Sequence, residues 1–263
     1  MQGTGKFALE RLADGLATRH GLGARERQAL LALPGSVVRC RAATEIAPGD
    51  GDARVHFVIE GLLASARQLA GGRRQVSALY IPGDLCGLDR AVAPRRGWEV
   101  CASCDSLVLS LSRQAVTGIA QEHPPIARAL WGETALQAGI TAEWLVGLGR
   151  RDAKSRLAHL LCEMGLRLEA AGLGSRQHFR LDASQALLAD VLGLTSVHVS
   201  RTLQELRGEG LAIARGRIIE VPDWPRLARA AEFEPDYLRP ALAAASPPAA
   251  MMTVQGTGQA TLG

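Results

Sequence analysis

Residues 184–206 have the sequence SQALLADVLGLTSVHVSRTLQEL, and this stretch does most to decide the fold. Ser184 can accept a hydrogen bond from a free backbone N–H of a first helical turn, and Thr195 can do the same for a second helix. Gly193 lies between them and supplies the backbone freedom that a tight turn between helices requires. The stretch therefore predicts a helix-turn-helix.

The second of these helices is predicted to present a polar face near its N-terminus. Val199, Leu203 and Leu206 are spaced to face inward, with Thr202 at a position where an aliphatic residue is common. His198 can either contact DNA or pack against the first helix. A helical hairpin in an unrelated core is the alternative, and the match at six constrained positions argues against it. A helix exposed in this way fits the major groove of DNA. The residues expected to face outward are Ser196, Val197, Ser200 and Arg201.

A predicted β-hairpin follows at residues 211–221, LAIARGRIIEV, with its turn at Arg215 and Gly216. Arg215 and Arg217 at its tip are placed to contact phosphate, as in a winged helix, although solvated turns also favour arginine. Double-stranded DNA is therefore the expected partner. The candidate contacts are Ser184, Thr195, Ser196, Val197, His198, Ser200, Arg201, Arg215 and Arg217.

The chain before this unit is divided into helical, β-rich and helical parts. The first 33 residues have near-helical apolar spacing, whereas residues 37–111 alternate short β-branched runs with turn residues. Strands this short, separated by turns about every 8–12 residues, are typical of a small β-roll or barrel. The sequence predicts an α+β fold with a jelly-roll-like N-terminal β-roll, a long helix and a C-terminal winged helix-turn-helix.

Residues 125–149 can form one helix, about 37 Å long. A helix of this length needs a partner for its apolar side, which favours pairing with a second copy of the chain over packing on the roll. A second helix is expected to begin at Arg150 and Arg151 and to end near residues 172–174. The expected apolar stripe of the long helix contains Leu130, Gln137, Trp144 and Leu148, with Ile126, Leu136 and Ile140 beside it.

Composition and charge are ordinary for a globular protein of 263 residues with a net charge of +4. All but two of the 30 basic residues are arginine, which suits nucleic-acid contacts and is equally what a GC-rich genome produces. No apolar run could span a membrane and no secretory leader is expected. Five scattered cysteines indicate a reducing compartment, so we expect the cytoplasm. The composition of residues 241–263 predicts a disordered tail.

Together these features resemble the CRP/FNR superfamily of bacterial regulators. The resemblance covers residues 37–233, and its most specific stretches are FVIEG at 57–61, IPGD at 81–84, GRRDA at 149–153 and residues 184–210. It implies a homodimer that also contacts RNA polymerase. The implied parts are N-terminal helices with a sensory β-roll (1–115), a dimerisation helix (116–149) and a DNA-binding domain (150–233).

Within that resemblance, Arg201 stands where the family has a base-contacting arginine. Ser196 and Val197 stand where the best-known members have an Arg-Glu pair, so the base preference at those positions stays open. A palindromic DNA site, with one half-site for each subunit, is the expected target.

The sensor site departs further from the cyclic-AMP-binding members. These have a Gly-Glu pair, whose carboxylate holds a ribose hydroxyl, and a downstream Arg-Ser or Arg-Thr pair for the cyclic phosphate. Here the first pair is Gly87-Leu88, and Arg96-Gly97 is the only candidate for the second. Cyclic AMP is therefore not expected to bind. The candidate effector pocket contains Gly83, Asp84, Gly87, Leu88 and Arg96.

No cofactor, metal site or catalytic site is expected. The iron–sulfur cluster of the FNR branch normally needs four cysteine ligands, several near the N-terminus, and here the first is Cys40. Cys101 and Cys104 are three apart beside a strand, which favours small buried side chains over ligands or redox-reactive thiols. The rival to a DNA-binding regulator is a cyclic-nucleotide-binding-like scaffold or regulatory subunit whose helical end binds protein.

Overall fold

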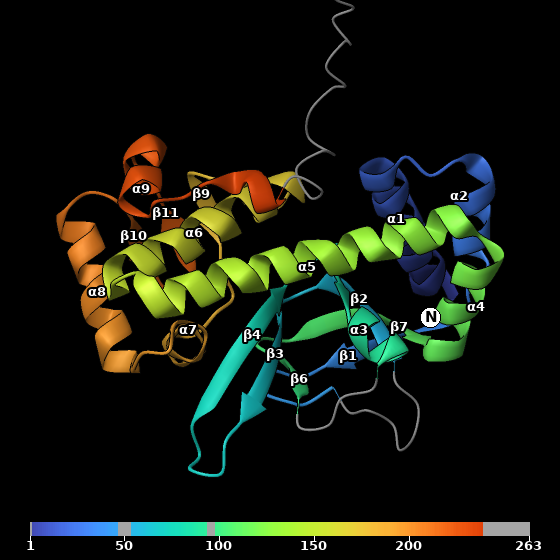
Figure 1. Ribbon diagram of the computed structural model, residues 1–263, viewed down its shortest axis with the longest axis horizontal. Coiled ribbons are helices and arrows are strands. Elements are labelled where there is room, and N and C mark those ends of the chain that lie inside the picture. The colour runs from blue at the N-terminus through green and yellow to red at the C-terminus, as the bar shows by residue number, and fades with distance from the viewer. Residues whose placement is uncertain (1, 47–53, 94–97, 239–263) are drawn as a thin grey trace, which may run out of the picture.

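The chain forms an α+β structure in which one long helix connects two domains (Figure 1). The N-terminal helices α1 (Gln2–His20) and α2 (Ala24–Leu31) lie at one end of the long axis. Helix α8 (Ser196–Gly208) lies at the other end, and α5 (Pro124–Arg150) runs between them. The computed structural model describes residues 2–46, 54–93 and 98–238. The expected tail at 241–263 and Arg96 of the candidate effector pocket lie outside these residues.

The N-terminal domain is the expected β-roll, built from two antiparallel sheets with strand orders β1-β7-β2-β5 and β4-β3-β6. Successive side chains of a strand point to opposite faces. Val55, Phe57 and Ile59 of β2 accordingly pack toward α1 and α2, while Val58 enters the core between the sheets. The strands are β1 Gly35–Cys40, β2 Arg54–Glu60, β3 Leu63–Gln68, β4 Arg74–Tyr80, β5 Leu85–Cys86, β6 Glu99–Ala102 and β7 Ser106–Ser112, and the short helix α3 is Leu88–Val92.

The range 116–149, expected to be one dimerisation helix, is divided between two helices. Helix α4 (Arg113–Glu122) ends before His123, and Pro124 opens α5 at its first turn. Proline is tolerated there because the first N–H groups of a helix have no partner within it, whereas further along it would break the helix. Helix α5 has 27 residues and is about 40 Å long.

The predicted stripe of α5 lies against the rest of this chain, with Trp144 buried and Leu130, Gln137 and Leu148 half-buried. Ile126, Leu136, Ile140 and Trp144 are buried against the same chain, because the roll and the next helix cover that side of α5. A different face is left open. It contains Trp131, Thr134, Ala135, Ala138, Thr141, Ala142, Leu145 and Val146.

The helix expected to begin at Arg150 and Arg151 begins later than predicted. The N-terminus of α6 (Ala153–Ala170) is capped by Asp152, whose Oδ1 accepts a hydrogen bond from the Ser155 N–H at 2.8 Å, so Arg150 and Arg151 lie outside it. Two short strands after α6 were not expected, and they extend the wing into a sheet of order β10-β11-β9-β8. The remaining elements are β8 Gly174–Ser175, β9 His178–Arg180, α7 Gln185–Leu192, β10 Ile213–Arg215, β11 Ile218–Glu220, α9 Trp224–Ala230 and the 3-10 helix η1 Pro235–Leu238.

A continuous apolar core joins the two domains. Leu62, Val76 and Leu79 of the roll belong to the same buried cluster as the inward residues of α6 and α7. Polar contacts accompany it, since Gln75 Nε2 of β4 donates to the Val191 carbonyl at 3.2 Å. The first helix of the helix-turn-helix is therefore docked on the roll.

Candidate nucleic-acid interface

Both helices of the predicted helix-turn-helix begin at the predicted caps. Ser184 Oγ accepts a hydrogen bond from the Leu187 N–H at 3.1 Å, and Thr195 Oγ1 accepts one from the His198 N–H at 3.2 Å. Gly193 between them has a φ of +62°, a conformation that favours glycine. The sequence signals for the start of each helix and for the turn are confirmed.

Helix α8 buries one face and exposes the other. Val199, Thr202 and Leu206 are buried. Leu203, predicted to face inward, is only half-buried. Thr202 Oγ1 donates to the His198 carbonyl one turn earlier at 2.9 Å, so its methyl group can pack without leaving the hydroxyl unpaired. This explains why a polar residue replaces an aliphatic one there.

The exposed face of α8 carries four of the nine predicted DNA contacts. Ser196, Val197, His198 and Arg201 are exposed, and Ser200 is half-buried. Within the described residues Arg201 takes part in no ion pair or hydrogen bond, so its guanidinium can engage an incoming group. The alternative that His198 packs against the first helix is not realised.

The wing is a tight hairpin in which Arg215 pairs with Ile218 in the strand register and Gly216 has a φ of +63°. The Arg215 side chain is 70% exposed, and its Nε lies 3.9 Å from Glu220 Oε1. Arg217 is more enclosed, with its Nη1 3.5 Å from Asp182 Oδ1. The two predicted wing arginines thus differ: Arg215 projects into solvent and Arg217 faces back toward the helices.

A groove of about 460 Å³ separates the wing from the two helices. It brings together three predicted residues, Ser184, Ser200 and Arg217. Three polar groove residues were missed in the sequence: Gln185, Gln204 and Arg207. Helical spacing could have identified Gln204 and Arg207, because positions 196, 200, 204 and 207 lie on one face of α8. Thr195, Ser196, Val197, His198, Arg201 and Arg215 lie outside the groove lining.

The structure separates the residues of the candidate effector pocket. Gly87 and Leu88 line a cavity of about 530 Å³ between the roll and α5. Gly83 and Asp84 line a different cavity, of about 360 Å³, between α1, the roll and α6. These two positions therefore do not share a cavity with Gly87 and Leu88.

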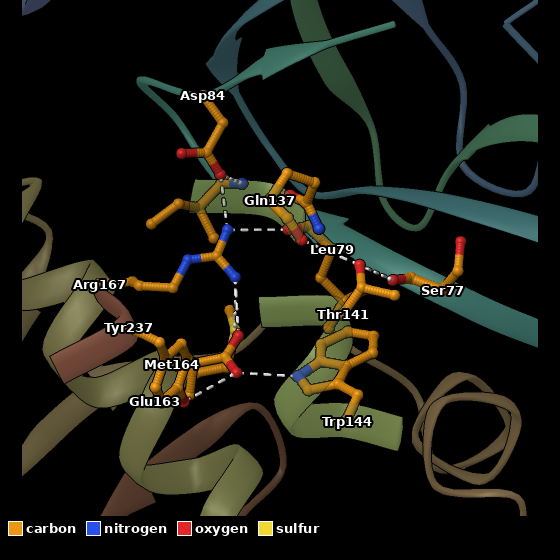
Figure 2. A network of polar contacts seen from close by, with 11 residues as sticks. Ser77, Leu79, Asp84, Gln137, Thr141, Trp144, Glu163, Met164, Arg167 and Tyr237 are labelled. Carbon is orange, nitrogen blue, oxygen red and sulfur yellow. Dashed lines mark hydrogen bonds and ion pairs between the residues drawn. The ribbon is translucent and has the colours of Figure 1, made fainter. Parts of the chain in front are cut away.

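Asp84 is instead part of a buried contact between the domains, the junction network, which also contains Trp144, Glu163, Arg167 and Tyr237 (Figure 2). Asp84 Oδ2 accepts hydrogen bonds from Arg167 Nη2 at 2.7 Å and from the Ile81 N–H at 2.8 Å. The other end of the Arg167 guanidinium contacts Glu163 Oε1 at 2.9 Å. Figure 2 shows Arg167 lying between the two carboxylates.

Glu163 connects this ion pair to α5 and to the C-terminal end of the described chain. Its Oε2 accepts hydrogen bonds from Trp144 Nε1 at 2.8 Å and from the Tyr237 hydroxyl at 3.3 Å. Burial raises the pKa of Glu163, although Arg167 and these two donors stabilise its charged form. Through these contacts the roll, α5, α6 and η1 are all connected to the buried carboxylate of Glu163.

The described residues hold no group of histidines, cysteines and carboxylates suited to a metal ion. Cys101 and Cys104 are both partly exposed. They are thus less buried than the sequence suggested. Over the same described ranges, no helix is long and apolar enough to cross a membrane.

Comparison with known proteins agrees with this geometry. A family model of the Crp-like helix-turn-helix domain matches residues 155–230. The chain is similar to the nitrogen fixation regulation protein FixK of Azorhizobium caulinodans, with 28% identity over 187 residues, which are 71% of this chain and 75% of that protein. A relative from Rhizobium leguminosarum bv. viciae, named a probable transcriptional activator, is 30% identical over 70% of this chain and 76% of its own length.

The solved structures give the same result. FixK2 from Bradyrhizobium japonicum has 30% sequence identity and a TM-score of 0.67, over 75% of this chain and 98% of that one. A CRP-family transcriptional regulator from Thermus thermophilus shares the fold at 23% identity with a TM-score of 0.57, over 74% of this chain and 96% of that one. These relatives are transcription regulators and not enzymes, so the chain is a DNA-binding regulator rather than a scaffold. The chain belongs to the CRP/FNR family of transcription regulators.

Proposed function

We propose that the protein binds a two-fold symmetric DNA site as a homodimer, with the N-terminal end of α8 in the major groove of each half-site. The observation that carries this proposal is the exposed polar face of α8, where Arg201 has no partner among the described residues. In dimeric helix-turn-helix proteins the half-sites are about one helical turn, roughly 34 Å, apart.

Each of the predicted contact residues has a proposed role in DNA binding. Arg201, Ser196, Val197 and His198 face base edges, where arginine can form a forked contact with guanine. The N-terminal ends of α7 and α8, at Ser184 and Thr195, together with Ser200, Arg215 and Arg217, contact the phosphate backbone.

CRP/FNR regulators typically act as dimers. The open face of α5 supports this assembly for the present chain. Trp131 is 72% exposed and Leu145 is 70% exposed, and small residues, Ala135, Ala138 and Ala142, separate them. Positions 131, 138 and 145 are seven apart, the spacing at which two helices can keep one face in contact. An apolar face of this kind is stabilised when a second copy covers it.

A signal received by the roll is proposed to tune DNA binding. The cavity beside Gly87 and Leu88 is lined by Tyr80, Trp98 and Leu145, which favours a mainly apolar molecule. Leu88 stands where the cyclic-AMP-binding members have a carboxylate, so we expect calorimetric titration with cyclic AMP to give no saturable heat at physiological concentrations. A one-per-subunit isotherm would contradict this.

We place the protein in the cytoplasm, where bacterial DNA lies, with RNA polymerase as a further partner at the promoter. The direct test of this partner is the yield of transcript in vitro from a template that carries the selected site. Added protein should change the yield with purified polymerase and should not change it on a template without the site.

Selection from a random duplex library tests the proposed mode of DNA binding. A two-fold symmetric consensus bound with micromolar or better affinity is expected, with affinity falling steeply as salt rises because phosphate contacts release counterions. A consensus without symmetry would contradict the dimeric mode.

The assembly is tested by sedimentation of wild type and of Leu145→Asp. This variant should shift the protein toward the monomer and weaken binding to the full site. Leu69→Asp, which changes an exposed leucine of the roll, is the matched control and should leave the dimer intact. A wild-type monomer at micromolar concentration would contradict the assembly.

A further inference from the structure

Asp182 lies between β9 and α7, and its carboxylate is shared by two arginines. Arg180 Nε donates to Asp182 Oδ2 at 3.1 Å, and Arg180 Nη2 lies 2.7 Å from Oδ1. Arg217 Nη1 approaches the same Oδ1 at 3.5 Å. The Asp182 side chain is only 23% exposed, so both guanidiniums converge on one partly enclosed negative charge.

The main chain around Asp182 is fixed from both domains. Ser103 of the roll donates its Oγ proton to the Asp182 carbonyl at 2.7 Å. The neighbouring Leu181 N–H donates to the Arg217 carbonyl at 2.8 Å, and Leu181 itself is buried. The position of the carboxylate relative to Arg217 is therefore set by the fold and not by a flexible loop.

A carboxylate at this place works against DNA binding. Arg217 lines the groove between the wing and the helices together with Ser184, Gln185, Gln204 and Arg207. A phosphate that approaches this groove competes with Asp182 for Arg217 and is repelled by the negative charge of Asp182. Glu169, by contrast, pairs with Arg176, and neither residue lines the groove.

We propose that Asp182 restrains DNA binding by acting as the counter-ion of Arg217, so that a phosphate must displace the carboxylate to gain the arginine. This inference rests on the phosphate contact proposed for Arg217. Asp182 is a positioning residue that acts through Arg217 and does not itself touch DNA. It lowers the affinity for DNA of any sequence.

Fluorescence anisotropy with the full chain tests the proposal, using the selected duplex and a random duplex between about 50 and 300 mM salt. Asp182→Asn keeps an acceptor for Arg180 and removes the charge. It should raise the affinity for both duplexes about five-fold at about 0.15 M salt and leave the salt slope close to that of wild type, because the same phosphate contact is made in both proteins. Circular dichroism checks that each variant is folded.

Two further variants separate the restraint from other effects of charge. Glu169→Gln removes one negative charge from an arginine pair outside the groove lining and should leave affinity and slope unchanged. In a protein that already carries Arg217→Ala, adding Asp182→Asn should not raise the affinity for DNA. An equal gain in Glu169→Gln, or a gain that persists without Arg217, would overturn the proposal.

Arg217→Ala alone distinguishes the failure of this inference from the failure of the contact on which it rests. If Arg217→Ala weakens binding and flattens the salt dependence while Asp182→Asn changes nothing, the contact stands and the restraint is refuted. If Arg217→Ala changes neither quantity, the proposed phosphate contact is refuted and the restraint with it. A loss of affinity in folded Asp182→Asn would show that Asp182 holds Arg217 toward DNA, the opposite of the proposal.

Discussion

In the helix-turn-helix, the side-chain bonds that cap each helix join residues three positions apart, as between Ser184 and Leu187. In the junction network, Arg167 pairs with Asp84, 83 positions away. The first region uses neutral hydroxyls at a solvent-exposed surface, whereas the second buries one arginine against two carboxylates. A neutral contact within one helical turn stabilises the end of a helix, and losing it lowers the free energy of unfolding only slightly. A buried charged contact holds one domain against the other, and removing one partner lowers that free energy much more because a buried charge is left unpaired.

The largest expected effect comes from breaking the junction network. Arg167→Met keeps the apolar stem of the side chain but leaves Glu163 and Asp84 without their cation. Removing one partner of a buried ion pair leaves an uncompensated charge, so the free energy of unfolding should fall by about 3–5 kcal/mol. Urea denaturation measures it.

The matched control for Arg167→Met is Arg27→Met, because Arg27 and Asp14 form an exposed ion pair. Its free energy of unfolding should stay close to that of wild type. If the two variants lose similar amounts of unfolding free energy, the buried ion pair of the junction network contributes no more to stability than an exposed ion pair.

The next effect is a pH dependence beside the junction network, at His159, whose ring stacks on that of Tyr237. Burial, aided by the nearby charge of Arg151, lowers the pKa of His159 to about 4. Glu143 Oε2 lies 3.6 Å from His159 Nε2 but is engaged by Arg151, so it does not offset the burial. The folded state thus favours neutral His159, and its contribution to stability is present above the ordinary pKa of 6.5 and is lost as the pH falls toward 4.

Between about pH 7 and pH 4.5 this loss should amount to about 2–3 kcal/mol for His159. Urea denaturation at both pH values should show that wild type loses this much more than His159→Gln does. If both proteins lose the same free energy of unfolding between these pH values, His159 is solvated in the folded state.

The smallest effect is expected in the helix-turn-helix. Ser184→Ala removes the cap of α7 and should lower the free energy of unfolding by about 1 kcal/mol. Ser184→Asn keeps a side-chain acceptor and should stay near wild type, as the same urea titration can show. A loss as large as that of Arg167→Met would remove the energetic difference between the two regions.

This difference also explains what the sequence could predict. Ser184, Gly193 and Thr195 act within one helical turn of their own positions, so the caps and the turn were visible in the residue order. The exposed face of α8 followed from helical spacing in the same way. The short strands separated by turns indicated a roll or barrel, and the family resemblance then supplied the expected roles of the domains.

Features that depend on distant packing were not visible in the sequence. Leu136 and Trp144 have a spacing that suits a dimer helix equally well, and only the roll and α6 show that they are covered. Asp84 resembles a residue of an effector pocket until Arg167 is placed beside it. The role proposed for Asp182 likewise depends on its contact with Arg217, which is 35 positions away along the chain.

The contact between Arg201 and DNA is the central claim about function, and one substitution tests it most directly. A forked contact from arginine to guanine contributes about 1–3 kcal/mol of discrimination. Folded Arg201→Ala should therefore weaken binding to the selected duplex by about that amount and leave binding to random duplex nearly unchanged, as measured by fluorescence anisotropy. Arg217→Ala, as a phosphate contact, should weaken both alike and flatten the salt dependence by about one ion. Equal losses of selected and random duplex in Arg201→Ala would contradict the assignment of α8 as the base-contacting helix face.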